Sequence, residues 1–204
     1  MIKILHLLIL MMFCFPVLAD TTAIVERVQE KAAYQRQGNQ YPVTLRTELR
    51  SGDIITTSRD ARIQIRFPDD SFVRIGGGAR VGFNRLIPPA KNKGVLKVVF
   101  NVLKGVFRFT SNTKKHDVKI NVGNSMTIGV RGTDIYTNAQ PDQDAVCLIT
   151  GEIIIQSGKL KVTLNQHREG FIVPKNGLTK GLPIRRVIPN DQFDMWLEKS
   201  EFSD

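Results

Sequence analysis

The length and composition fit a single protein domain of ordinary size. The chain has 204 residues, of which 29 are Lys or Arg and 19 are Asp or Glu, so its formal net charge is +10. A chain of this length can bury a substantial hydrophobic core. Aromatic residues make up 7% of the chain and include one Trp, which is a poor supply of rings for stacking on sugars or bases. We expect no nucleic-acid partner.

Residues 1–19 have the parts of a removable export signal. Lys3 supplies the positive start, residues 4–15 are almost continuously apolar, and Ala19 precedes a cleavage point at Asp20. The apolar run is short for a transmembrane span, and an uncleaved N-terminal anchor is the alternative. We expect an exported mature chain without a transmembrane span after cleavage. Loss of Lys3 lowers its net charge from +10 to +9.

The chain that follows alternates apolar and polar residues with a period of two, which predicts strands with one buried face. The alternation is clear at 61–67, 107–109, 118–122 and 160–164. Ile154 lies between two further isoleucines, which predicts a strand that is covered on both faces. Turns rich in Gly, Pro and Asp separate these segments. The spacing predicts an all-β fold of stacked strand-and-turn units, either a sandwich or a solenoid-like stack.

A faint internal repeat supports stacking. Residues 103–111 and 149–157 both read apolar-x-Gly-x-apolar-x-apolar-x-Ser, with Gly105 and Gly151 at the same position, and a weaker third copy begins at Gly52. Repeated units of this kind can stack, each covering the open face of the next. The alternative is that unrelated strands share their turn chemistry by chance.

The sequence predicts the secondary structure of the C-terminal end of the mature chain more clearly than that of the N-terminal end. Apolar residues at 24, 28 and 32 fit one face of a helix, but the same segment also fits a strand. Near the C-terminus, Asn190 could cap a short amphipathic helix that places Phe193, Trp196 and Leu197 on one face. The expected division is a signal at 1–19, a β domain at 20–185, and a tail at 186–204 that contains this helix.

Five segments, in this order, resemble the FecR domain family of periplasmic proteins. They are 49–57, with Gly-Asp-Ile-Ile-Thr at its centre, 61–75, 103–107, 128–134 and 146–153. The run Gly-Val-Arg-Gly-Thr-Asp at 129–134 is the most specific part, and the resemblance covers roughly residues 45–156. It implies a β-rich module in the periplasm of a Gram-negative bacterium.

The resemblance also suggests a partner. The best-known family members are inner-membrane regulators that meet a ferric-chelate transporter outside and a sigma factor inside. Such a regulator needs a cytoplasmic domain and a membrane span before the periplasmic module, and we see neither before the signal. We therefore expect this chain to share the fold of the family and its contact with another envelope protein. We do not expect it to control a sigma factor.

The residues give no sign of an enzyme, a metal site or a cofactor. His116 and His167 remain after the signal, and neither has a second His at ligand spacing. Cys147 is then the only cysteine, so no internal disulfide can form, and its apolar neighbours predict a buried thiol. Paired carboxylates such as Asp142 with Asp144 fit solvated turns.

Most candidate site residues fit a structural role. Gly129 and Gly132 would permit tight backbone paths in the 129–134 run, although Arg131 could instead present its guanidinium to an acidic partner. The family motif residues expected to be structural are Gly52, Asp53, Asp70, Ser71, Gly105, Gly129, Arg131, Gly132, Thr133 and Gly151.

Two hypotheses about function follow. The first is a non-catalytic protein-interaction or signalling-type module in the bacterial envelope. The alternative is a binder of cell-wall or other anionic envelope polymer through basic loops, with Lys91, Lys93, Lys114 and Lys115 as candidate binding residues beside Arg131. Solvation of ordinary loops would explain the same lysines.

Overall fold

The described strands form one continuous sheet. The structure is a computed structural model that describes residues 23–87, 95–111, 113 and 116–202, so the expected export signal lies outside it. In chain order the elements are β1 (Ala23–Gln29), β2 (Ala32–Arg36), β3 (Asn39–Pro42), β4 (Glu48–Leu49), β5 (Ile54–Thr57), β6 (Arg62–Arg66), β7 (Phe72–Ile75), β8 (Arg80–Ile87), β9 (Leu96–Thr110), β10 (His116–Val122), β11 (Met126–Ala139), β12 (Gln143–Ser157), β13 (Leu160–Leu164), β14 (Glu169–Pro174), β15 (Ile184–Val187) and α1 (Asn190–Glu198).

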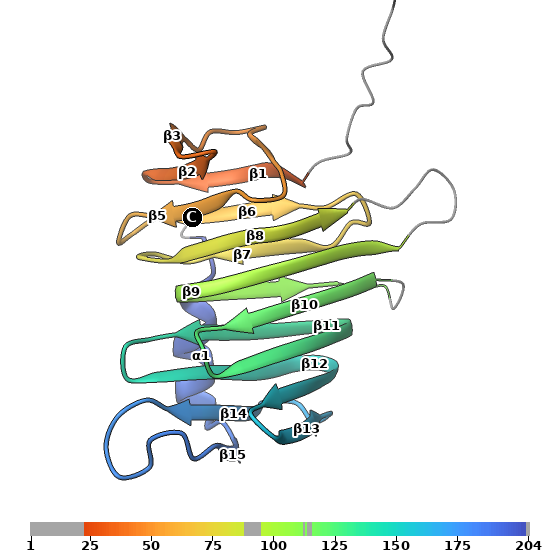
Figure 1. Cartoon of the computed structure of the whole chain (residues 1–204), viewed down its shortest axis with the longest axis vertical. Helices are drawn as coiled ribbons and strands as arrows, with labels where there is room; N and C mark the ends of the chain where they lie inside the picture. Colours follow the sequence, from red (N-terminus) through yellow and green to blue (C-terminus); the bar gives the residue numbers. More distant parts are fainter. Residues whose placement is uncertain (1–22, 88–94, 112, 114–115, 203–204) are drawn as a thin grey trace, which may run out of the picture.

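Three long strands fold this sheet into two layers. The first half of β9 pairs with β8 and β10, whereas its second half pairs with β7 and β11. β11 and β12 change layers in the same way. The front layer contains β2, β3, β5, β8, β10 and β13 with residues 96–104, 126–131 and 152–157. The back layer contains β1, β4, β6, β7, β14 and β15 with residues 105–110, 134–139 and 144–150 (Figure 1).

The main hydrophobic core fills the space between the layers. Phe100 of the front layer packs against Phe107 and Phe67 of the back layer, with ring centroids 5.0 and 5.7 Å apart, and against Phe83 of its own layer at 5.3 Å. All four rings are at most 2% exposed. Burial of such side chains contributes about 1.5–3 kcal/mol each, and this core holds the layers together.

A second, smaller core covers the outer face of the back layer. Helix α1 lies behind this layer (Figure 1). Its Trp196 stacks on Tyr136 of β11 with centroids 5.5 Å apart, and its Phe193 packs edge-on against His167. Cys147 also lies in this cluster and is fully buried. No helix within the described ranges is long and apolar enough to cross a membrane.

The structure confirms the all-β fold class with its short C-terminal helix, resolves one ambiguity and corrects two details. The ambiguous N-terminal segment is strand β1. The prediction that the strand around Ile154 is covered on both faces is wrong, because Ile154 points out of the front layer and is 40% exposed. Asn190 does not cap α1, since Pro189 precedes the helix and no side-chain cap bond forms. The domain boundary at 185/186 stays a prediction.

Candidate functional site

Three glycines of the predicted repeat lie where the chain passes between the layers. Gly52 (φ 90°) connects β4 to β5, Gly105 (φ 83°) bends β9, and Gly151 (φ 92°) bends β12. Only glycine adopts such positive φ values without appreciable strain. The repeat visible in the sequence therefore coincides with three crossings from one layer to the other.

The bends of β11 and β12 pack directly on each other. Gly132, at the bend of β11, has φ 58°. A Cβ atom added to Gly151 would lie 2.5 Å from the carbonyl oxygen of Gly132 and 3.0 Å from Cα of Thr133. Thr133 is 1% exposed, and its carbonyl oxygen accepts a hydrogen bond from the Ser111 N–H at 2.9 Å. A side chain at Gly151 would push these two backbones apart.

Asp134, the last residue of the 129–134 run, anchors an ion-pair network on the back layer. Its carboxylate accepts hydrogen bonds from Arg108 Nε at 2.9 Å, Arg108 Nη2 at 2.7 Å and Thr110 Oγ1 at 3.1 Å. Arg108 also pairs with Glu201 beyond α1, and Glu201 pairs with Arg74 at 2.5 Å. Burial disfavours the guanidinium charge, but Asp134 and Glu201 outweigh this and raise the pKa of Arg108.

Asp53 has a comparable role at the other end of the sheet. It is fully buried, and its two carboxylate oxygens accept hydrogen bonds from Arg36 Nε at 2.8 Å and Nη2 at 2.7 Å. The Arg50 N–H donates to the same carboxylate at 2.7 Å. The hydrogen bonds to Asp53 raise the pKa of Arg36. This bidentate pair ties β2 to the turn that leads into β5.

The turn between β6 and β7 contains Asp70 and Ser71. Asp70 has φ 62°, and its side chain is 92% exposed. Ser71 is 1% exposed and its N–H donates to the Asp69 carboxylate at 3.1 Å. Both residues belong to the geometry of a tight hairpin turn.

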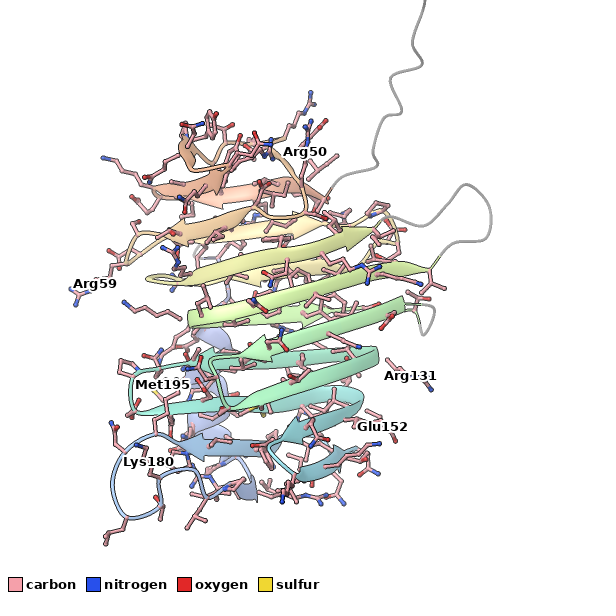
Figure 2. The ribbon with its side chains drawn as sticks, viewed as in Figure 1. Arg50, Arg59, Arg131, Glu152, Lys180 and Met195 are labelled. Atoms are coloured by element: carbon pink, nitrogen blue, oxygen red, sulfur yellow. The ribbon has the colours of Figure 1, made fainter. Side chains whose placement is uncertain are left out.

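Gly129 and Arg131 lie on the outer face of the front layer. Arg131 is exposed, stands opposite Glu152 in the β11–β12 register, and extends with it beyond the ribbon (Figure 2). A Cβ atom at Gly129 would have only the Ile154 carbonyl oxygen nearby, at 3.9 Å. The space above Gly129 is part of a shallow groove of about 320 Å³. Its lining residues are Asp117, Val118, Lys119, Gly129, Val130, Arg131, Glu152 and Ile154.

Four candidate binding residues lie outside the described residues. They are Lys91, Lys93, Lys114 and Lys115. Their part in binding an anionic polymer stays a prediction, as does the structural role of the family motif residues. Within the described ranges, no three His, Cys, Asp or Glu side chains form a cluster that could hold a metal ion.

One site was misjudged from the sequence. Asp144 was expected in a solvated turn, but it is fully buried at the start of β12. Its Oδ1 lies 2.6 Å from Lys175 Nζ, and its Oδ2 accepts a hydrogen bond from Ser125 Oγ at 2.7 Å. The angles at the Lys175 contact are not those of a hydrogen bond, yet the ion pair compensates the buried charge. Neither partner lies near Asp144 in the sequence.

The fold resembles known structures. Two crystal structures of a candidate anti-sigma factor from Parabacteroides distasonis ATCC 8503 align with it at a TM-score of 0.56 and 17% identity, over 71% of this chain. The alignments cover 63% and 64% of those chains, so this chain spans less than two thirds of their length. At this identity the likeness concerns the fold alone.

The sequence comparison assigns the family. No curated protein matches the chain. The family described as "FecR protein" matches residues 53–154, which lie within the region 45–156 where the resemblance was expected. This region contains the bends at Gly105, Gly132 and Gly151 and the Arg108–Asp134 ion pair, so it builds most of both layers. The chain belongs to the FecR protein family.

Proposed function

We propose that this protein is an exported periplasmic module that binds another envelope protein and has no catalytic activity of its own. Family membership supports a regulatory, signalling-type role, and the structural neighbours are described as a candidate anti-sigma factor. Residues 1–19 support export, because a positive start, an apolar run and a small residue before Asp20 are what an export signal requires.

The chemistry of the polar groups supports a binding role over catalysis. The buried carboxylates of Asp53 and Asp144 are each held in an ion pair within the fold. Burial raises the pKa of the Cys147 thiol to about 12, which leaves almost no thiolate at neutral pH. These groups stabilise the sheet and are not available as nucleophiles or bases.

The observation that carries the proposal is the open edge formed by β15. Among the described strands, β15 pairs only with β14, and all four of its residues are exposed. Ile184 and Val187 are 41% and 55% exposed. An exposed edge strand is a template to which a partner can add a strand of its own.

The hydrogen-bond pattern identifies the atoms that a partner strand would meet. The Ile188 N–H donates to the Arg168 carbonyl oxygen at 2.8 Å, toward the sheet. Because N–H groups alternate in direction along an antiparallel strand, the Val187 N–H points to the open side. Proline at position 187 would remove this donor and leave the β14–β15 bonds in place.

The test is capture of envelope proteins by purified Val187→Pro and Val187→Ala variants. The alanine variant keeps the N–H and should retain the partner, whereas the proline variant should lose it while it melts at a similar temperature. Mass spectrometry identifies the captured protein. Equal capture by both variants would rule out the β15 edge, and no specific capture by the parent protein would rule out the protein-binding role.

A further inference from the structure

The two outer faces of the folded sheet differ in how they are covered. Helix α1 covers much of the back layer, but the described chain places no element over the strands β8 to β13 of the front layer (Figure 1). The outward side chains there form rows across neighbouring strands. One row runs Ile87, Lys97, Asp117, Arg131 and Glu152 from β8 to β12.

The two faces also differ in how their cations are neutralised. On the back layer, Arg66, Arg74 and Arg108 each pair with a carboxylate. Three other back-layer arginines have a neutral partner: Arg27 lies over the Phe202 ring, Arg62 donates to the Ala61 carbonyl oxygen, and Arg186 donates to Gln192 Oε1. On the front layer, no ion pair or side-chain hydrogen bond within the described chain involves any of the seven exposed, outward-facing cations. Those seven are Arg80, Arg85, Lys97, Lys104, Lys119, Arg131 and Lys161, and the same strands carry two exposed, outward-facing acids, Asp117 and Glu152.

A strip of neutral hydrogen-bonding groups crosses the centre of this face. Asn121 Nδ2 donates to Asn101 Oδ1 at 2.7 Å, and Thr127 Oγ1 donates to Asn121 Oδ1 at 2.9 Å. The groove above Gly129 lies beside this strip, between Lys119 and Arg131. The hydrogen bonds among Asn101, Asn121 and Thr127 hold the side chains of this strip in place, so little conformational freedom of the strip is lost when a ligand binds it.

We propose that the outer face of the front layer binds a linear acidic polysaccharide. The backbones of strands two apart in a sheet are separated by about 10 Å, so cations such as Lys97 on β9 and Arg131 on β11 form a spaced array of positive charges for a chain with regularly spaced carboxylates. The amide and hydroxyl strip can bond to sugar hydroxyls. None of the outward-facing residues described on β8 to β13 is aromatic, so recognition of the polysaccharide would rest on charge and hydrogen bonds and not on ring stacking.

The test measures binding of polygalacturonate to the purified protein by calorimetry at several salt concentrations. Lys119→Gln/Arg131→Gln removes two charges beside the groove. Arg59→Gln/Lys180→Gln removes two exposed charges elsewhere on the surface (Figure 2) and is the matched control. We expect the first variant to bind at least about tenfold more weakly and to have a salt dependence shallower by about 1.5 in log–log slope. The control should stay within about twofold of the parent.

A variant with fewer acids sharpens the test. Asp117→Asn/Glu152→Gln removes the two negative charges of the face and should bind polygalacturonate more tightly than the parent protein. Equal weakening in the groove and control variants would show that the basic chain attracts polyanions without a site, which overturns the proposal. Binding to vesicles of anionic lipid without binding to polygalacturonate would also overturn it. Val187→Pro should leave polysaccharide binding unchanged, which separates this test from that of the β15 edge.

Discussion

Gly151→Ala tests whether the bend of β12 requires a residue without a side chain at position 151. Alanine at φ 92° is strained by about 1–2 kcal/mol. Its Cβ atom would lie 2.5 Å from the Gly132 carbonyl oxygen, and the forced backbone shift costs about 1–3 kcal/mol more. Alanine also lowers the conformational entropy of the unfolded chain, which offsets about 0.4–1 kcal/mol of this destabilisation. We expect a net loss of about 3 kcal/mol in the free energy of unfolding.

Gly158→Ala is the control for this prediction. Gly158 has φ 56° in the turn before β13, and a Cβ atom there would have no neighbour within 4 Å. Its loss should be at most about 1 kcal/mol, because only the conformational strain remains. Urea unfolding followed by the fluorescence of Trp196, the one Trp in the chain, measures both variants. Equal losses would show that the packing of the β11 and β12 bends does not require glycine.

Three further predictions concern single side chains. Ile153→Asp should lower the melting temperature sharply, because Ile153 is 1% exposed and an unpaired buried carboxylate costs several kcal/mol. Ile154→Asp should cost only about 1 kcal/mol, because Ile154 is 40% exposed and the loss is mainly one of strand propensity. Equal melts of the two variants would refute this orientation of the strand. The hydrogen bond from Arg66 lowers the pKa of Glu26. The Arg66–Glu26 pair therefore stabilises the fold above the ordinary carboxyl pKa, and this stabilisation is lost as the pH falls through the lowered pKa of Glu26. Glu26→Gln should be less stable than the parent at neutral pH by under about 1 kcal/mol, and a stability difference that persists in strongly acidic melts would contradict this role of the pair. Cys147 should react with a thiol reagent only in denaturant, because burial raises its pKa to about 12, and labelling of the native protein at pH 8 would be inconsistent with this burial.

Local sequence patterns were enough to predict the strands and the turns. Alternation at Ile63 and Ile65 identifies a strand with one buried face, and both residues are fully buried. The shared position of Gly105 and Gly151 indicated stacked units, and both glycines lie at bends with positive φ. These features depend on residues within a few positions of one another, where propensity and periodicity operate.

Long-range features could not be predicted in this way. Arg108 and Glu201 are 93 positions apart, and only the docking of the C-terminal helix brings them together. The same docking covers the outer face of the back layer and leaves that of the front layer open, which is why Ile154 is exposed between two buried isoleucines. Alternation within one strand does not reveal which outer face a helix covers.

The N-terminus of the protein recovered from cells tests the central claim of an exported envelope module most directly. The chain would be expressed from Met1, with residues 1–19 in place, in a Gram-negative host. The cells would be fractionated, and the protein in each fraction sequenced from its N-terminus. Our proposal predicts a protein that begins at Asp20 in the periplasmic fraction. A protein that begins at Met1 in the cytoplasmic or membrane fraction would contradict it.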